Sequence, residues 1–66
     1  MTVIVNGGSR ELPAGATLAD LLELLGVPSG GVAVALDGAV LPRESWPGTV
    51  LREGASVEVL TAVQGG

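Results

Sequence analysis

The segment from Thr17 to Gly26 constrains the fold of this 66-residue chain most, because it alone has the apolar spacing of an amphipathic helix. Thr17 and Asp20 form a capping-box-like pair at its start, and Gly26 followed by Pro28 predicts its end. Leucines at i, i+3, i+4 and i+7 form one apolar face. That face consists of Leu18, Leu21, Leu22 and Leu25. A helix of about two and a half turns is long enough to cover one face of a small sheet.

The segments outside this helix show the alternation and the β-branched residues that are typical of strands. An Asn-Gly-Gly turn signal separates the first two, which predicts an antiparallel hairpin. Residues 43–46, with a proline on either side, predict one helical turn or a loop. The strands themselves are expected at residues 2–6, 9–12, 32–36, 39–41 and 56–63.

This order of elements predicts an α+β fold, a mixed sheet of four to five strands with one helix packed across it. The first and last strands are expected to pair in parallel near the middle of the sheet. Residues 1–63 then form a single domain, and residues 64–66 form a flexible C-terminal tail. The chain contains neither cysteine nor histidine, so packing has to stabilise this domain without a disulfide or a zinc site.

Composition argues against several classes of partner. Seven acidic side chains against three arginines give a net charge of −4, and Trp46 is the one aromatic residue. Nucleic acid is therefore not an expected partner, whereas a basic protein surface fits this charge. No apolar run approaches the roughly 18 residues of a membrane span. The N-terminus lacks the basic and apolar regions of a signal peptide, so we expect a cytoplasmic location.

The chain ends in Gly65 and Gly66, directly after an apolar strand. Glycine keeps almost no bulk around its Cα, so such a tail can pass a carboxylate through a narrow cleft. A frayed terminus without function explains the same two residues. The chain also has no lysine and thus no side-chain amine for an isopeptide bond. Composition bias accounts for that absence, but its chemical consequence is the same.

A candidate docking surface follows from alternation along the last strand. Leu60 and Ala62 lie on the opposite face from Val57 and Val59, so they face outward if these valines face the helix. Exposed apolar patches usually mark docking sites, although scattered surface apolar residues are also common. The predicted partner-binding residues are Ile4, Ala35, Leu60 and Ala62, and the outward-facing Ala33 is expected to extend the same patch.

No catalytic residue is expected, because without histidine and cysteine the chain offers no nucleophile–base pair. Asp20 and Glu23 are better explained by helix capping and solubility than as paired catalytic carboxylates. Trp46 is more typical of a cover over the sheet edge than of a ligand contact, and Arg43 of a solvated surface charge.

Three features together give the chain a specific resemblance. They are the Asn-Gly turn after the first strand, the helix opening at 17–22, and the stretch 32–54 with its Pro-Arg-x-x-Trp piece, followed by the terminal di-glycine. Over essentially its whole length the chain resembles the ThiS family, the ubiquitin-like β-grasp sulfur carriers of thiamine biosynthesis. Three positions depart from the family pattern: Asp37 stands where Asn is frequent, Leu41 where Val is frequent, and Ala55 where Asp is frequent.

The resemblance implies a carrier rather than an enzyme, with no permanently bound cofactor. An E1-like adenylyltransferase of the ThiF type would use ATP to convert the Gly66 carboxylate into an acyl-adenylate. Sulfur from a sulfur-donating protein would then displace AMP and leave a C-terminal thiocarboxylate. The thiazole synthase ThiG would receive this sulfur and supply the lysine that the chain lacks. The carrier itself is expected to be a monomer when free.

Other readings share the same tail. A sulfur carrier for molybdopterin or cysteine synthesis would have the same fold and di-glycine end. A ubiquitin-like protein modifier would join its activated terminus to an amine instead of sulfur. A plain interaction module would tolerate the loss of Gly66.

Overall fold

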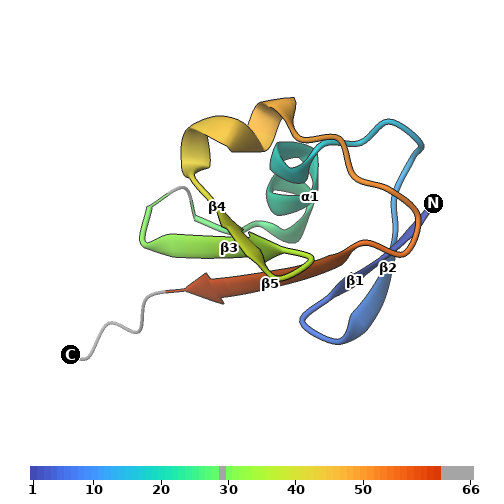
Figure 1. Cartoon of the computed structure of the whole chain (residues 1–66), viewed down its shortest axis with the longest axis horizontal. Helices are drawn as coiled ribbons and strands as arrows, with labels where there is room; N and C mark the ends of the chain where they lie inside the picture. The colour runs from blue at the N-terminus through green and yellow to red at the C-terminus, as the bar shows by residue number, and fades with distance from the viewer. Residues whose placement is uncertain (29, 62–66) are drawn as a thin grey trace.

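Five strands form one mixed sheet in the computed structural model, which describes residues 1–28 and 30–61. The order across the sheet is β2-β1-β5-β3-β4. The neighbours β1 and β5 run parallel and the other pairs are antiparallel. The strands are β1 (Thr2–Val5), β2 (Gly8–Glu11), β3 (Val32–Leu36), β4 (Ala39–Leu41) and β5 (Ser56–Thr61). Figure 1 shows both helical segments, α1 (Leu18–Leu25) and the 3-10 helix η1 (Arg43–Gly48), on one side of this sheet.

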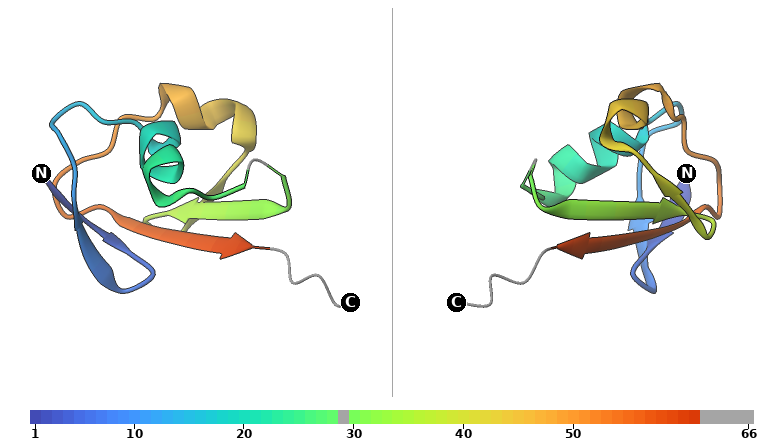
Figure 2. Two further views of the ribbon diagram at one scale, coloured as in Figure 1. Left: turned by 180° about the vertical axis from the view of Figure 1, so that it is seen from behind. Right: turned by 60° about the vertical axis from the view of Figure 1, so that its left-hand side comes forward.

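This architecture confirms the predicted α+β fold, and five strands are present. The last strand lies between β1 and β3, so the expected parallel pairing of the first and last strands is also confirmed. Both views in Figure 2 show the helices on the same face and β5 within the sheet. The described part of β5 ends at Thr61, so the predicted continuation through residues 62–63 and the tail at 64–66 lie outside the described residues.

The β1–β2 hairpin closes through a two-residue turn. Asn6 and Gly7 both have positive φ, 49° and 85°, and Val5 pairs with Gly8. Two positive φ values in succession are typical of a type I′ turn, whose twist matches that of the flanking strands. The Asn-Gly signal read from the sequence is therefore confirmed.

Helix α1 begins and ends at the predicted residues. The Thr17 hydroxyl accepts a hydrogen bond from the Asp20 N–H (3.1 Å), and the Asp20 carboxylate accepts one from the Thr17 N–H (2.9 Å). Gly26 ends the helix in the left-handed conformation, with φ 72°. Leu18, Leu21 and Leu22 of the predicted apolar face are buried, and Leu25 is half-buried. This helix thus covers the sheet with the face that the leucine spacing predicts.

The core lies between the sheet and the two helical segments. Val3, Val34 and Val57 come from three different strands and are buried against α1 together with its leucines. Trp46 is only 7% exposed, and its indole Nε1 donates a hydrogen bond to the Leu41 carbonyl oxygen at 3.1 Å. The tryptophan therefore closes the core beside the edge strand β4, as the sequence predicts.

The capping box generates a first test. Thr17→Ala removes the hydroxyl that accepts the Asp20 N–H, so we expect the free energy of unfolding to fall by about 1 kcal/mol. Urea unfolding measures this change. Thr17→Ser keeps the hydroxyl and is the control, with an expected stability near that of the unsubstituted protein. An unchanged urea midpoint for Thr17→Ala would show that the capping contact contributes no stability.

Candidate docking surface and carrier terminus

The face of the sheet opposite α1 and η1 carries no helix from the described part of the chain (Figure 2). Strand register places particular side chains there. Ala33 pairs with Leu60 and Ala35 with Glu58, because β3 and β5 are antiparallel neighbours. On its other side, Ala35 pairs with Val40 of the edge strand. Paired residues share a face, so these side chains lie together on the outer side.

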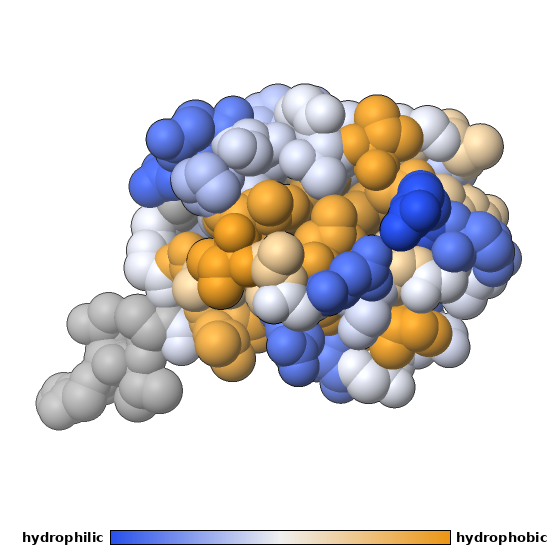
Figure 3. Space-filling view, viewed as in Figure 1, coloured by the Kyte–Doolittle hydropathy of each residue, from blue (hydrophilic) through white to orange (hydrophobic). Residues whose placement is uncertain are grey.

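We call Ala33, Ala35, Val40 and Leu60 the outer patch. Leu60 is 68% exposed and Val40 75% exposed, although both side chains are aliphatic. Ala33 is exposed beside Leu60, and Ala35 is half-buried between its two neighbours. Figure 3, which looks onto the β4 edge of the sheet, shows hydrophobic side chains gathered at that edge. An apolar surface of this kind usually marks a place where another protein binds.

The structure brings together some of the predicted partner-binding residues and separates another. Leu60 and Ala35 both belong to the outer patch. Ile4 lies on the same face but pairs with Ser56, four residues before Leu60, which is about 13 Å along the strand. Ile4 is also only half exposed. The predicted Ala62, Gly65 and Gly66 lie outside the described residues.

Two residues of this surface escaped the sequence reading. The sequence predicts only that Val40 lies in a short strand at residues 39–41, and its place beside Ala35 follows from the pairing of β4 with β3. Glu58 has no role in the sequence analysis, yet it pairs with Ala35 on the outer face. Alternation along residues 56–61 could have indicated that Glu58 shares a face with Leu60.

Asn6 holds the C-terminal half of β5. Its side-chain Nδ2 donates to the Val59 carbonyl oxygen (3.2 Å), and the Val59 N–H donates to Asn6 Oδ1 (2.9 Å). One amide side chain thus replaces the backbone partners that β1 no longer provides after Val5. On the opposite side, β3 pairs with β5 as far as Val32 and Thr61. The strand is therefore held on both sides next to Leu60.

Asp37 makes a similar contact at the beginning of β5. Its N–H donates to the Ser56 carbonyl oxygen (2.7 Å), and its Oδ1 accepts the Ser56 N–H (2.9 Å). Asp37 Oδ2 lies 3.6 Å from Arg52 Nη2 in an exposed ion pair. The carboxylate at this departure from the family pattern therefore accepts the Ser56 N–H, as an Asn side-chain oxygen could. The exposed ion pair adds little stability.

The remaining candidates have structural roles or lie at the surface. Asp20 caps α1, as predicted, while Glu23 and Arg43 are exposed. Within residues 1–28 and 30–61, no group of three or more His, Cys, Asp or Glu residues is placed to hold a metal ion. In the same part of the chain, no helix has the length and apolar character needed to cross a membrane.

Comparison with known proteins adds to this geometry. The model of the ThiS family matches residues 3–66, nearly the whole sequence. This chain belongs to the ThiS family. The sulfur carrier protein ThiS of Thermus thermophilus is 42% identical over 64 residues, which cover 97% of this chain and 98% of that protein. The ThiS of Escherichia coli is 29% identical over 66 residues, with both chains covered in full.

Structural comparison agrees with the family match. A crystal structure of the thiamine biosynthesis protein ThiS from Geobacter metallireducens superposes with a TM-score of 0.83 at 33% identity, and both chains are covered in full. The β-grasp fold and the role of a ThiS-type sulfur carrier in thiamine biosynthesis, both predicted from the sequence, are therefore confirmed. A thiazole synthase of Paramagnetospirillum magneticum is also 32% identical over 66 residues, which are all of this chain and 20% of that protein.

The Asn6 contacts predict how the end of β5 responds to substitution. Asn6→Asp keeps an acceptor for the Val59 N–H but sets a second oxygen against the Val59 carbonyl. Asn6→Gly removes both hydrogen bonds while tolerating the positive φ. We expect each variant to lose about 1–2 kcal/mol in urea unfolding, because each loses at least one of the two bonds.

Hydrogen exchange at the Val59 N–H localises the effect. Its protection should fall in Asn6→Gly by more than that of amides in α1, because the Val59 N–H loses its acceptor. Equal loss of protection throughout the domain would contradict a specific role of Asn6 at the end of β5.

Proposed function

We propose that the C-terminal carboxylate of Gly66 carries the sulfur, and that Gly65 lets it enter the active site of an activating enzyme. The supporting observation is that the family match runs through the last residue of the chain, so the di-glycine end belongs to the shared pattern. The low bulk of glycine is what a narrow active-site channel requires.

The chemistry explains why the carrier needs an activating partner. A carboxylate is ionised at neutral pH and is a poor electrophile. In the proposed sequence, a carboxylate oxygen of Gly66 attacks the α-phosphate of ATP, and pyrophosphate leaves. A sulfur nucleophile then attacks the carbonyl carbon of the acyl-adenylate, and AMP leaves. Hydrosulfide gives the thiocarboxylate directly. A persulfide of the donor protein gives an acyl disulfide instead, and a thiol then cleaves its S–S bond, which leaves the thiocarboxylate and a disulfide between the thiol and the donor.

The chain contributes the carboxylate to this sequence, and its partners contribute the catalytic groups. With no cysteine, histidine or lysine, it offers none of the usual side chains for nucleophilic or imidazole catalysis. We therefore assign adenylation to an E1-like enzyme of the ThiF type and sulfur delivery to a separate sulfur-donating protein. ATP is a substrate of the activating enzyme in this scheme, and the carrier holds no permanent cofactor.

The recipient of the sulfur is, in this proposal, the thiazole synthase ThiG. Support comes from the Paramagnetospirillum magneticum thiazole synthase, in which one fifth of the protein matches this entire chain. A carrier-like segment within a synthase is expected if carrier and synthase act on the same intermediate. The synthase would also provide the lysine amine, which this chain lacks. We assign the reaction to the cytoplasm, with residues 1–63 as the folded domain and 64–66 as the tail.

The docking surface proposed for these partners includes the outer patch, together with the predicted Ile4 and Ala62. Leu60 is its most useful test residue, because it is 68% exposed and contributes little to the core. It also lies close in sequence to the terminus that must reach the activating enzyme.

Leu60→Glu places a charge on this surface and should weaken activation without unfolding the domain. We expect the apparent KM for the carrier in ATP–pyrophosphate exchange to rise by about tenfold or more, as for a central interface residue. Leu24→Glu is the matched control, because Leu24 is 65% exposed but belongs to α1 on the other layer. If folded Leu60→Glu has the same apparent KM as Leu24→Glu and the unsubstituted protein, Leu60 does not belong to the interface.

Intact mass tests the role of Gly66 directly. The protein is incubated with its activating enzyme, ATP and a sulfur source, beside a variant that lacks Gly66. We expect a mass gain that corresponds to replacement of one oxygen by one sulfur, and no gain in the truncated variant.

Other outcomes of this measurement point to different functions. An amide-linked adduct on a second protein would indicate a protein modifier. The absence of any adduct, under conditions in which the activating enzyme is shown to be active, would contradict the proposal that Gly66 carries sulfur.

A further inference from the structure

Glu58 places a charge within an otherwise uncharged region of the outer face. On that face, the described residues of β3, β4 and β5 are the outer patch, Ser56 and Glu58. Glu58 pairs with Ala35 across the ladder and stands two residues from Leu60 on its own strand. Its carboxylate therefore adjoins the surface on which a partner is proposed to dock.

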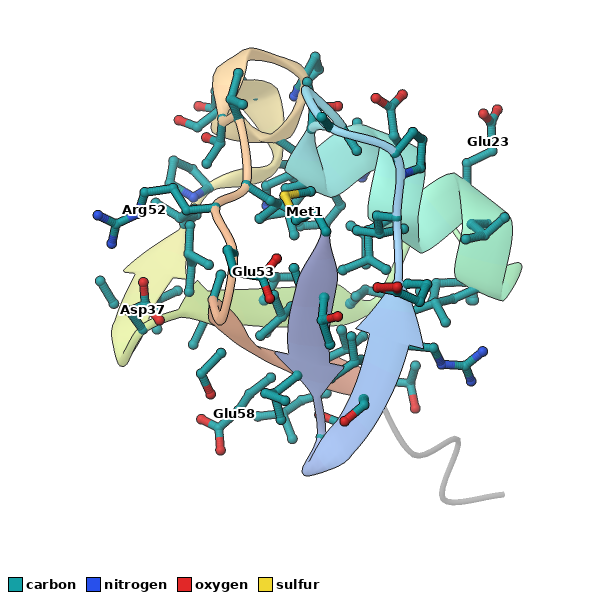
Figure 4. All side chains as sticks on the ribbon, turned by 90° about the vertical axis from the view of Figure 1, so that its right-hand side faces the viewer. Met1, Glu23, Asp37, Arg52, Glu53 and Glu58 are labelled. Atoms are coloured by element: carbon teal, nitrogen blue, oxygen red, sulfur yellow. The ribbon has the colours of Figure 1, made fainter. Side chains whose placement is uncertain are left out.

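No cation in the described part of the chain pairs with this carboxylate. The two ion pairs within 4.0 Å join Arg52 to Asp37 and the N-terminal amine to Glu11. The other arginines, Arg10 and Arg43, belong to β2 and η1. Figure 4 shows Glu58 at the sheet, away from Glu23 on α1. Glu58 is exposed, and water solvates its charge in the free protein.

Docking changes the environment of Glu58. A partner that covers the outer patch removes water from the carboxylate, which costs free energy unless a cation or hydrogen-bond donors replace the water. A purely apolar partner surface leaves this cost uncompensated. A second copy of the chain, docked by the same face, would bring a second carboxylate to the interface and add repulsion.

We propose that Glu58 is a specificity-determining residue of the outer patch, and that it pairs with a lysine or arginine of the activating enzyme. That cation would stand among apolar side chains that contact Leu60 and Val40. The carrier's net charge of −4 and its complete lack of lysine favour a basic partner surface. This inference rests on the proposed function, because it assigns a feature to the partner that adenylates Gly66.

The test compares Glu58→Gln with Glu23→Gln. Glutamine keeps the size of the side chain and removes its charge, and both positions are exposed, so both variants should fold. ATP–pyrophosphate exchange is measured at increasing carrier concentrations with the activating enzyme at low salt. We expect the apparent KM of Glu58→Gln to rise by about tenfold with little change in kcat, because the interface loses a charge pair. Glu23→Gln should match the unsubstituted carrier.

Salt dependence separates a charge pair from a packing effect. The KM of the unsubstituted carrier should rise with sodium chloride, whereas that of Glu58→Gln should change less, because its interface has lost one screened interaction. An unsubstituted carrier that supports no exchange would overturn the proposed function itself. With normal exchange by that carrier, an unchanged KM and an unchanged salt response in Glu58→Gln would overturn the role of Glu58 alone.

Discussion

The pairing of β5 with strands on both sides is the interaction on which the rest of the structure depends. β1 contacts it in parallel and β3 in antiparallel, so the last strand of the chain lies at the centre of the sheet. Its inward side chain Val57 is fully buried under α1, while Leu60 points to the opposite face. One strand therefore joins the core to the outer surface, and it is the last strand before the terminus that we propose to carry the sulfur.

Side chains complete this pairing where backbone partners end. Asp37 bonds both backbone groups of Ser56, and Asn6 bonds both backbone groups of Val59. Both residues have φ of 49° and lie in hairpin turns. Asn and Asp tolerate the left-handed conformation better than most residues, and their short polar side chains can bond nearby backbone. Each residue thus closes a turn and also holds β5.

One face of the sheet is buried in the core and the other is exposed to solvent. The face toward α1 and η1 buries the valines, the leucines and Trp46, and this packing provides stability in a chain without disulfides. The opposite face keeps Leu60 and Val40 in solvent, where they contribute little to folding. Such residues are free to serve a partner, because their exposure leaves the core unchanged when they are substituted. This separation suits the proposed carrier, which would bind different enzymes in turn without unfolding.

The sequence alone determined the elements whose signals are local. The capping box of Thr17 and Asp20, the stop at Gly26 and the Asn6–Gly7 turn all depend on residues within a few positions of one another. Alternation also placed Leu60 on the outer face, and the family resemblance predicts the role proposed for Gly66. Each of these predictions draws on neighbours along the chain or on a pattern shared with relatives.

Only the tertiary structure decided the contacts between distant segments. The bonds from Asn6 to Val59 join residues 53 positions apart, and those from Asp37 to Ser56 join residues 19 apart. The places of Val40 and Glu58 on either side of Ala35 likewise follow from strand register. A shift of one residue in register moves every side chain of a strand to the other face. Core packing selects the register, so local sequence signals cannot specify which outer residues become neighbours.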